Sequence, residues 1–396
     1  MKRAIVLAVF FVFAISLFGM NRIVEIAVEG NAKTLDSTVR DLSGIKIGDE
    51  FDIEKIYRAK RTLQESGLFT DVYMQIKTVD SDYRLVITVE EANTIYPYFG
   101  QYLTIGAGER NLLGTGVNIY GGLRFLRFTD KKFLGFIPQP QFFWGGFTLG
   151  AGYPQALGTG IDFITELTLF KEVPWQSDLL LTLNRFKLGA SYPFGDYVAG
   201  VSYTFESGTF DASVTNDYSV SIVNGAFAFG DAENFRQERS NLYGNTVLSY
   251  GFGKGFSYLQ QTAVMNFWYR IIGRIYILSN TRAGVTYLGT APVTKQFYIG
   301  GNTDLKGWNP YSFNPGHFVF ESVEAGVPLT ENFGIAPSDE LSVYIPKLYL
   351  MGVAGSDKTF GLSIGIGFEW RTPLGIAFEP QIFFGGDGFK FYFELR

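Results

Sequence analysis

The chain has 396 residues, no cysteine, one histidine and a formal net charge of -5, and only 18% of its residues are charged. The lack of cysteine excludes disulfides and a lipidated signal cysteine, and the mildly acidic balance argues against nucleic-acid partners. His317 lies in a Pro-Gly-His loop context and cannot build a catalytic set or a metal cluster. We therefore expect no enzyme, cofactor or metal chemistry.

The first 19 residues have the pattern of an export signal. Lys2 and Arg3 precede an apolar run of 15 residues, 4–18, and Gly19 offers a small residue for cleavage. A helix that spans a bilayer needs roughly 20 apolar residues. The pattern therefore predicts a cleaved signal peptide over 1–19, with an uncleaved helical anchor as the alternative.

Residues 20–92 are charge-rich and form a candidate small domain. Asp52 is placed to cap a helix, and Gly67 suits the left-handed position after its end. The alternation and helical spacing of apolar residues predict the order β-α-α-β-β. The expected elements are a strand over 22–29, helices over 34–42 and 53–66, and strands over 70–77 and 83–90.

This segment resembles a POTRA domain in the pieces "IVEIAVEGN", "GIKIGDEFD", "LQESGLFTDVYMQI" and "YRLVITVEE". Its last two strands form a hairpin, and the first should run beside the final one. The strand over 70–77 then lies at an edge, which can add an extended peptide as a further strand. An edge that packs on a neighbouring chain or on the rest of the protein is the alternative. The candidate edge residues are Thr70, Val72, Met74 and Ile76.

Residues 93–396 read as a series of extended segments in which apolar and polar side chains alternate. The pattern is clear over 163–170, 263–270 and 363–371, with turn clusters such as 111–116 between the runs. About 300 residues suit an antiparallel barrel of about 16 strands, and in lipid such a sheet should close on itself. The predicted fold class is mainly β. A soluble β-sandwich or propeller is the alternative.

The last eight residues alternate without a break. One fully apolar face and one polar face indicate a strand that separates lipid from water. We interpret it as the closing strand of the barrel. Its apolar face carries Phe389, Phe391, Phe393 and Leu395, and its other face carries Lys390, Tyr392, Glu394 and Arg396.

Three further stretches resemble the outer-membrane assembly superfamily that includes BamA and TamA. "GAGERNLLGTGVNIYGGLRF" (106–125) is similar to its first barrel hairpin, and "FYIGGNTDLKGWNPYSF" (297–313) to its long sixth extracellular loop. "SIGIGFEWRTPLGIAFEP" (363–380) is similar to its penultimate hairpin. The resemblance implies an outer-membrane barrel, a periplasmic POTRA domain, and insertion of β-barrel proteins or translocation of polypeptides. It implies unfolded outer-membrane polypeptides, the lipid bilayer and accessory assembly subunits as partners. A two-partner-type secretion channel and a passive pore or anchor are the alternatives.

The resemblance also implies a lock inside the barrel. The family's sixth loop carries an Arg-Gly-aromatic motif that meets acidic residues of the inner wall, and this chain has Lys306, Gly307 and Trp308 there. Glu324 matches one acidic wall position, whereas Met351 stands where a second acid is usual. A lysine is a point charge and cannot bridge two carboxylates as a guanidinium does. We therefore expect a single Lys306–Glu324 contact, with a solvated loop lysine as the alternative.

The family resemblance finally implies a weak seam between the first barrel strand, expected over 98–106, and the last, 389–396. Gly385, Gly386 and Gly388 precede the last strand and favour a weakened or bent edge, unless they only form an ordinary turn. The chain departs from the family pattern because it ends in Leu-Arg rather than in an aromatic residue. The candidate seam residues are Tyr102, Phe389, Phe391 and Phe393.

Overall fold

The computed structural model describes most of the chain after the predicted signal peptide, which lies outside the described residues. The described ranges are 22–80, 82–133, 137–156, 159–175, 179–211, 217–230, 242–271, 275–301, 304–309, 311–329, 343–371 and 377–395. The chain forms two compact units, Met1–Thr168 and Leu169–Arg396. Within the described ranges, no helix is long and apolar enough to cross a bilayer.

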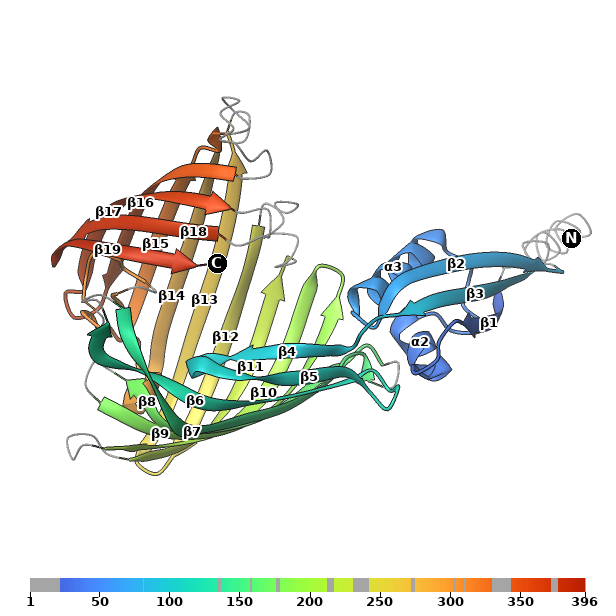
Figure 1. Ribbon diagram of the computed structural model, residues 1–396, viewed down its shortest axis with the longest axis horizontal. Coiled ribbons are helices and arrows are strands. Elements are labelled where there is room, and N and C mark those ends of the chain that lie inside the picture. The colour runs from blue at the N-terminus through green and yellow to red at the C-terminus, as the bar shows by residue number, and fades with distance from the viewer. Residues whose placement is uncertain are drawn as a thin grey trace, which may run out of the picture. The chain divides into compact units, whose positions relative to one another are not determined.

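The first elements confirm the predicted order β-α-α-β-β (Figure 1). They are β1 (Ile23–Glu29), α2 (Asp36–Ser43), α3 (Ile53–Glu65), β2 (Phe69–Val79) and β3 (Asp82–Glu91). The three strands form a sheet in the order β1-β3-β2, with β1 parallel and β2 antiparallel to β3. The central strand is therefore the last one in sequence, and β1 and β2 are the edges.

Local sequence signals explain where these helices begin and end. The Asp52 carboxylate accepts the backbone N–H of Glu54 at 2.9 Å, which satisfies one of the free donors at the start of α3. Gly44 and Gly67 follow the two helices with φ of 64° and 68°, a conformation that costs glycine little. Both helices pack their apolar residues onto one face of the sheet. That core includes Val39, Leu63, Val72, Leu85 and Ile87.

The described residues after β3 form a sheet of 16 strands in sequential order from β4 to β19 (Figure 1). This confirms the predicted antiparallel sheet of about 16 strands. The expected closure of the sheet is not formed, because among the described residues β4 pairs with β5 alone and β19 with β18 alone. The strands are β4 (Ile95–Gly100), β5 (Thr104–Leu112), β6 (Val117–Phe133), β7 (Ile137–Tyr153), β8 (Asp162–Trp175), β9 (Leu179–Phe194), β10 (Tyr197–Phe210), β11 (Tyr218–Phe229), β12 (Leu242–Gly253), β13 (Phe256–Arg270), β14 (Tyr276–Thr290), β15 (His317–Gly326), β16 (Val343–Gly355), β17 (Phe360–Arg371), β18 (Ala377–Gly385) and β19 (Gly388–Leu395).

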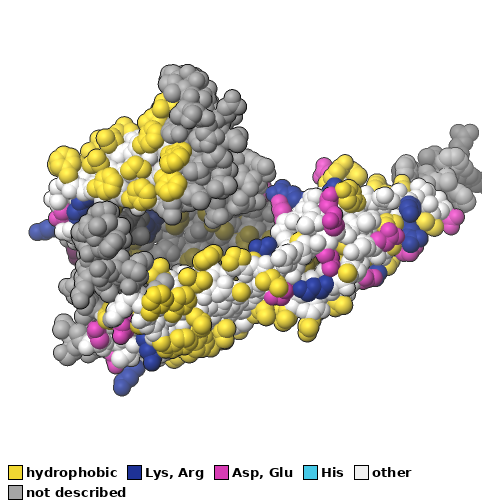
Figure 2. All heavy atoms as spheres, in the orientation of Figure 1, with side chains coloured by type: hydrophobic (Ala, Val, Ile, Leu, Met, Phe, Trp, Pro, Cys, Tyr) yellow, Lys and Arg dark blue, Asp and Glu magenta, His cyan; other side chains and the backbone are white. Residues whose placement is uncertain are grey.

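The two faces of this sheet differ in the way that the alternation predicts. In β17 the side chains of Leu362, Ile364 and Ile366 are exposed, whereas Ser363 and Glu369 are buried on the opposite face. Figure 2 shows the exposed hydrophobic side chains as broad patches over the strands. An apolar outer face and a polar inner face are what a barrel wall in lipid requires.

The prediction of a first barrel strand over 98–106 was wrong. β4 ends at Gly100, the 3₁₀ turn η1 spans Gln101–Leu103, and β5 begins at Thr104. The Thr104 hydroxyl donates to the Gln101 carbonyl at 2.6 Å, and Leu103 adopts a φ of 61°. The turn residues 101–103 include neither proline nor glycine. The alternation of apolar and polar residues therefore seemed to continue from β4 into β5. Tyr102 therefore belongs to the turn between two strands.

Candidate functional site

The candidate site is the segment between β14 and β15, residues 291–316, which we call the lumen loop. It contains the 3₁₀ turn η3 (Val293–Lys295), and Ile299 and Phe313 form an antiparallel bridge that folds its central part back on itself. Leu305 near the tip is fully buried. It packs in an apolar cluster with inner-face residues of β15, β16, β18 and β19. That cluster comprises Ile299, Leu305, Phe318, Phe320, Tyr349, Met351, Val353, Phe383 and Tyr392, with Phe297, Trp308 and Phe313 against it.

Met351 thus takes part in apolar packing at the position where an acid was expected. Its side chain is 6% exposed and belongs to the same cluster as Leu305. Burying apolar area stabilises this contact without an ion pair. The loop is therefore held here by hydrophobic contact.

Gly307 allows the loop tip to touch the β18–β19 turn directly. Its φ is +89°, and a Cβ atom on it would lie 2.8 Å from the backbone nitrogen of Gly385. The Gly307 N–H donates to the Tyr392 hydroxyl at 2.9 Å, and its carbonyl accepts the Asp387 N–H at 3.3 Å. Any other residue at position 307 would be strained and would push the tip away.

Trp308 occupies the space that Gly386 leaves. A Cβ on Gly386 would lie 2.3 Å from the indole ring of Trp308. The ring also packs against Phe313 with centroids 4.9 Å apart, and its Nε1 donates to the Leu362 carbonyl at 3.1 Å. The partly buried indole is therefore held by apolar contact and by one hydrogen bond.

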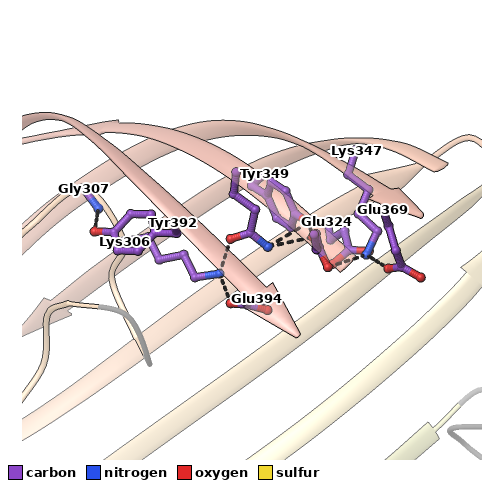
Figure 3. A network of polar contacts seen from close by, with 10 residues as sticks. Lys306, Gly307, Glu324, Lys347, Tyr349, Glu369, Tyr392 and Glu394 are labelled. Carbon is purple, nitrogen blue, oxygen red and sulfur yellow. Dashed lines mark hydrogen bonds and ion pairs between the residues drawn. The ribbon is translucent and has the colours of Figure 1, made fainter. Parts of the chain in front are cut away.

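Lys306 has partners other than the predicted one. Its buried ammonium donates to Glu394 of β19 and to Gln381 of β18, and it lies 5.3 and 5.8 Å from the rings of Phe383 and Tyr392 (Figure 3). The alternative of a solvated loop lysine does not fit this burial. The charge is fixed by a carboxylate, an amide and two aromatic faces.

Glu324 instead pairs with Lys347 of β16 at 2.9 Å and accepts the Tyr276 hydroxyl at 2.7 Å. The expected Lys306–Glu324 pair is therefore not formed. Lys347 is almost fully buried and also contacts Glu369 and Glu379 (Figure 3). The wall acids are neutralised by a lysine of the wall itself.

The two lysines are nevertheless linked through one hydrogen-bonded network. The Gln381 amide donates to Glu379 at 2.6 Å, and the Glu379 carboxylate lies 3.3 Å from Lys347. The network thus runs from Lys306 through β18 to Glu324 (Figure 3). Glu324 therefore belongs to the site, but it is linked to Lys306 only through Gln381, Glu379 and Lys347.

Lys347, Glu369 and Glu379 were missed by the sequence interpretation. A usable signal existed for Glu369, because the alternation in β17 places it on the face of Gly365 and Gly367, away from the apolar side chains. Lys347 faces Gly326 on one neighbouring strand and Gly367 on the other. The side chains of Tyr276 and Tyr349 lie over these two glycines, and only the strand register reveals this arrangement around Lys347.

A second buried ion cluster, which the sequence did not suggest, holds the beginning of the lumen loop. The carboxylate of Glu206 in β10 lies 2.7 Å from the ammonium of Lys295 and 2.8 Å from Arg185 of β9. It also accepts the Tyr218 hydroxyl at 2.6 Å. Val293 packs beside it against an apolar cluster on the inner face of β9–β11. The loop is thus fixed near both its start and its tip.

The candidate edge residues of the POTRA domain differ in burial along β2. Val72 is fully buried in the core and Met74 packs against it, whereas Thr70 and Ile76 are exposed. Tyr73, which was not among the candidates, is 55% exposed on the outer face. Contacts to another chain along β2 would therefore use the backbone and the outward residues.

The candidate seam residues of β19 face outward. Phe389, Phe391 and Phe393 are 78%, 67% and 60% exposed, whereas Tyr392 and Glu394 face the loop tip. β19 pairs with β18 from Gly388 to Leu395.

Among the described residues, no group of three or more His, Asp or Glu side chains is arranged to hold a metal ion.

Comparisons with known proteins agree with these features. Residues 21–92 match the POTRA family model, described as a surface antigen variable number repeat. The outer membrane protein assembly factor BamA of Nitratidesulfovibrio vulgaris is 22% identical over 391 residues, which cover 89% of this chain and 47% of the relative. The chain therefore spans about half the length of that curated relative.

Solved structures show the same fold. BamA of Haemophilus ducreyi lacking POTRA domains 1–3 matches with a TM-score of 0.66 and 14% identity, over 95% of this chain and 85% of the other. CdiB of Acinetobacter baumannii matches with a TM-score of 0.64 and 11% identity, over 95% and 74%. CdiB of Escherichia coli matches with a TM-score of 0.59 and 13% identity, over 95% and 76%.

The POTRA match, the BamA relative and the solved BamA structure confirm the family resemblance. The 16-stranded sheet has the fold of the BamA and CdiB barrels. The chain thus resembles the BamA/TamA-like superfamily in its POTRA domain, in its sequence and in its fold.

Proposed function

We propose that the chain is an outer-membrane assembly factor that inserts β-barrel proteins into the membrane or translocates polypeptides across it. The observation that carries this proposal is the lumen loop, whose Lys306-Gly307-Trp308 tip is held by the last two strands. A passive pore has no need for a buried, charged fastening at its terminal strand. An assembly factor needs a terminal strand whose pairing is controlled.

The POTRA domain supplies a receiving edge in this proposal. β2 lies at the edge of a three-stranded sheet, so its outer backbone groups are available to pair with an extended chain. Unfolded outer-membrane polypeptides and accessory assembly subunits are the proposed partners. Their recognition would rest on main-chain hydrogen bonds, with the exposed Tyr73 and Ile76 adding apolar contact.

The terminal strand β19 supplies a second edge, on which a client strand could pair during insertion. β4 and β19 stand at the two ends of the strand order, and we propose that weak pairing between them offers an edge to a client strand. The outward phenylalanines of β19 match the side chains that a lipid-facing client strand carries.

The domain limits of this proposal are a signal peptide over 1–19, a POTRA domain over 20–92 and a barrel over 93–396.

A second candidate function is a two-partner-type secretion channel. The likeness to CdiB favours it, because that fold covers 95% of this chain at a TM-score of 0.64. The role of a passive pore or anchor stands third. The three differ in what their loss removes from the cell.

Depletion of the protein separates these functions. Loss of many outer-membrane proteins supports assembly, loss of one exported protein supports secretion, and altered solute flux alone supports a pore. Photo-crosslinkers at Tyr73 and Phe391 should capture unfolded outer-membrane polypeptides in living cells, whereas one at Tyr57 on the exposed side of α3 should not. Equal capture from Tyr73 and Tyr57 would refute a receiving role for β2.

A further inference from the structure

Most polar contacts of the loop tip are with one hairpin, β18–β19, while Trp308 also donates to the Leu362 carbonyl of β17 and Asp304 pairs with Arg282 of β14. Lys306 meets Glu394 and Gln381, Gly307 meets Tyr392 and Asp387, and the Asn309 N–H donates to Asp387 at 2.7 Å. The Lys390 ammonium in turn donates to the Asn309 side chain at 2.6 Å. The terminal strand is therefore held from its first residues to its last by the loop tip.

The wall network explains why the tip lysine reaches the terminal strand. Lys347 already neutralises Glu324 and lies against Glu369 and Glu379. Glu324 therefore already has a cationic partner, and Lys306 pairs instead with Glu394. The loop tip is fastened to the closing strand and not to Glu324.

The other end of the loop is fixed on different strands. Lys295 is held by Glu206 of β10, and Val293 and Ala291 pack on the apolar inner face of β9–β11. Between the two fixed points the chain runs from residue 295 to residue 306. The loop therefore connects the strands β9–β11 to the terminal hairpin β18–β19 across the inside of the second unit.

We propose that the lumen loop is a strap that ties the terminal hairpin to the β9–β11 wall, so that release of the loop tip and displacement of β19 are coupled. The inference rests on the proposed function and assigns to the loop the control of the terminal strand. When Lys306, Gly307 and Asn309 leave the hairpin, β19 loses these contacts on its inner face, while its pairing with β18 remains. Lys295 and Glu206 keep the released loop attached within the barrel.

Hydrogen exchange of the purified full-length chain in detergent tests the coupling directly. Lys306→Glu and Glu394→Lys should each raise amide exchange about tenfold in both the loop tip and β19, and the double charge swap should restore it. Lys295→Ala should raise exchange in 291–299 without a comparable change in β19. Lys254→Glu, on the exposed β12–β13 turn, is the matched control and should change neither.

Faster exchange in the loop tip with unchanged exchange in β19 would overturn the strap. Unchanged exchange in both segments for Lys306→Glu would overturn it as well. These readouts do not depend on any client, so they are independent of the proposed function.

A reversible crosslink tests what the coupling does. The chain has no cysteine, so Asn309→Cys with Asp387→Cys forms a single pair at a point where backbone and side chain are 2.7 Å apart. The oxidised form should stop client insertion, and the reduced form of the same variant is its control. Normal insertion by the oxidised form would overturn the proposed use of β19 displacement, even where the exchange data support the strap.

Discussion

The POTRA domain and the strands of the second unit place their side chains in opposite ways. In the POTRA domain Leu63 and Val72 are fully buried, while the Arg61–Glu65 pair is 56% and 61% exposed. In the second unit Ile366 is 60% exposed, while the Lys347–Glu369 pair is 1% and 2% exposed. The solvent outside each part, water or lipid, decides which side chains form its interior.

This difference changes what an ion pair contributes. An exposed pair contributes about 0–1 kcal/mol because water screens it. A buried pair adds little over an apolar core, but removal of one partner leaves a buried charge uncompensated. The exposed ion pairs of the POTRA domain should therefore tolerate substitution, whereas the buried pairs of the barrel interior should not.

The largest expected effect comes from Lys347→Met. The substitution leaves three carboxylates facing one another on the inner wall, and we expect a loss of about 3–5 kcal/mol in the free energy of unfolding. Urea unfolding of the folded barrel in detergent, followed by its electrophoretic mobility, measures this. Lys254→Met removes an exposed lysine and should change stability by less than about 0.5 kcal/mol. A barrel as stable as the wild type would show that the wall acids are solvated.

Removal of apolar volume should have a comparable effect in the core of the POTRA domain. Leu63→Ala creates a cavity in its core and should cost about 2–5 kcal/mol. Limited proteolysis of the full-length chain should then cut within 22–91, while Tyr57→Ala on the exposed side of the same helix should leave that segment resistant. Resistance of the Leu63→Ala domain would mean that the core can collapse around the cavity.

Much of the fold was predictable because its signals are local. Asp52 and Gly67 mark the ends of α3, and the alternation in β17 assigns its two faces. The first strand was misplaced because η1 contains no turn residue that breaks the pattern. Local sequence signals therefore suffice to predict the ends of an element wherever a capping or turn residue is present.

The site was predictable only in part, because its partners are set by strand register. Lys306, Gly307 and Trp308 were identified as a group, and the structure brings all three to the inner wall. The partner of Lys306 was not identified from the sequence. Lys306 and Glu394 are 88 residues apart and meet only when the loop tip packs against β19. Lys347 stands between two glycines of neighbouring strands, and no sequence pattern reveals that pairing.

An intermediate effect is expected where the loop and the hairpin meet through glycines. Gly307→Ala places a Cβ atom 2.8 Å from the Gly385 backbone at a φ of +89°, so we expect a loss of about 1–3 kcal/mol and a loosened loop tip. Gly255→Ala, at a φ of +79° in an open turn, controls for backbone strain alone. The difference between the two variants in urea unfolding measures the contact, and equal losses would exclude it.

The smallest effect is a pH dependence confined to the POTRA domain. Burial works to raise the pKa of Glu91, but N–H bonds from Thr34 at 2.6 Å and Lys33 at 2.8 Å outweigh it and hold that pKa below its usual 4.5. A carboxyl whose pKa is lowered on folding stabilises the domain above pH 4.5, and this contribution is lost as the pH falls through the lowered value.

Glu91→Gln should therefore flatten the fall in POTRA stability below pH 4.5 while it leaves the barrel unchanged. Denaturant unfolding between pH 3 and pH 7, followed by hydrogen exchange in residues 22–91, measures that slope. An identical slope in the wild type and in Glu91→Gln would mean that the backbone bonds stabilise the neutral carboxyl as well as the charged one. The hydrogen bonds to Glu91 would then make no contribution to the acid stability of the POTRA domain.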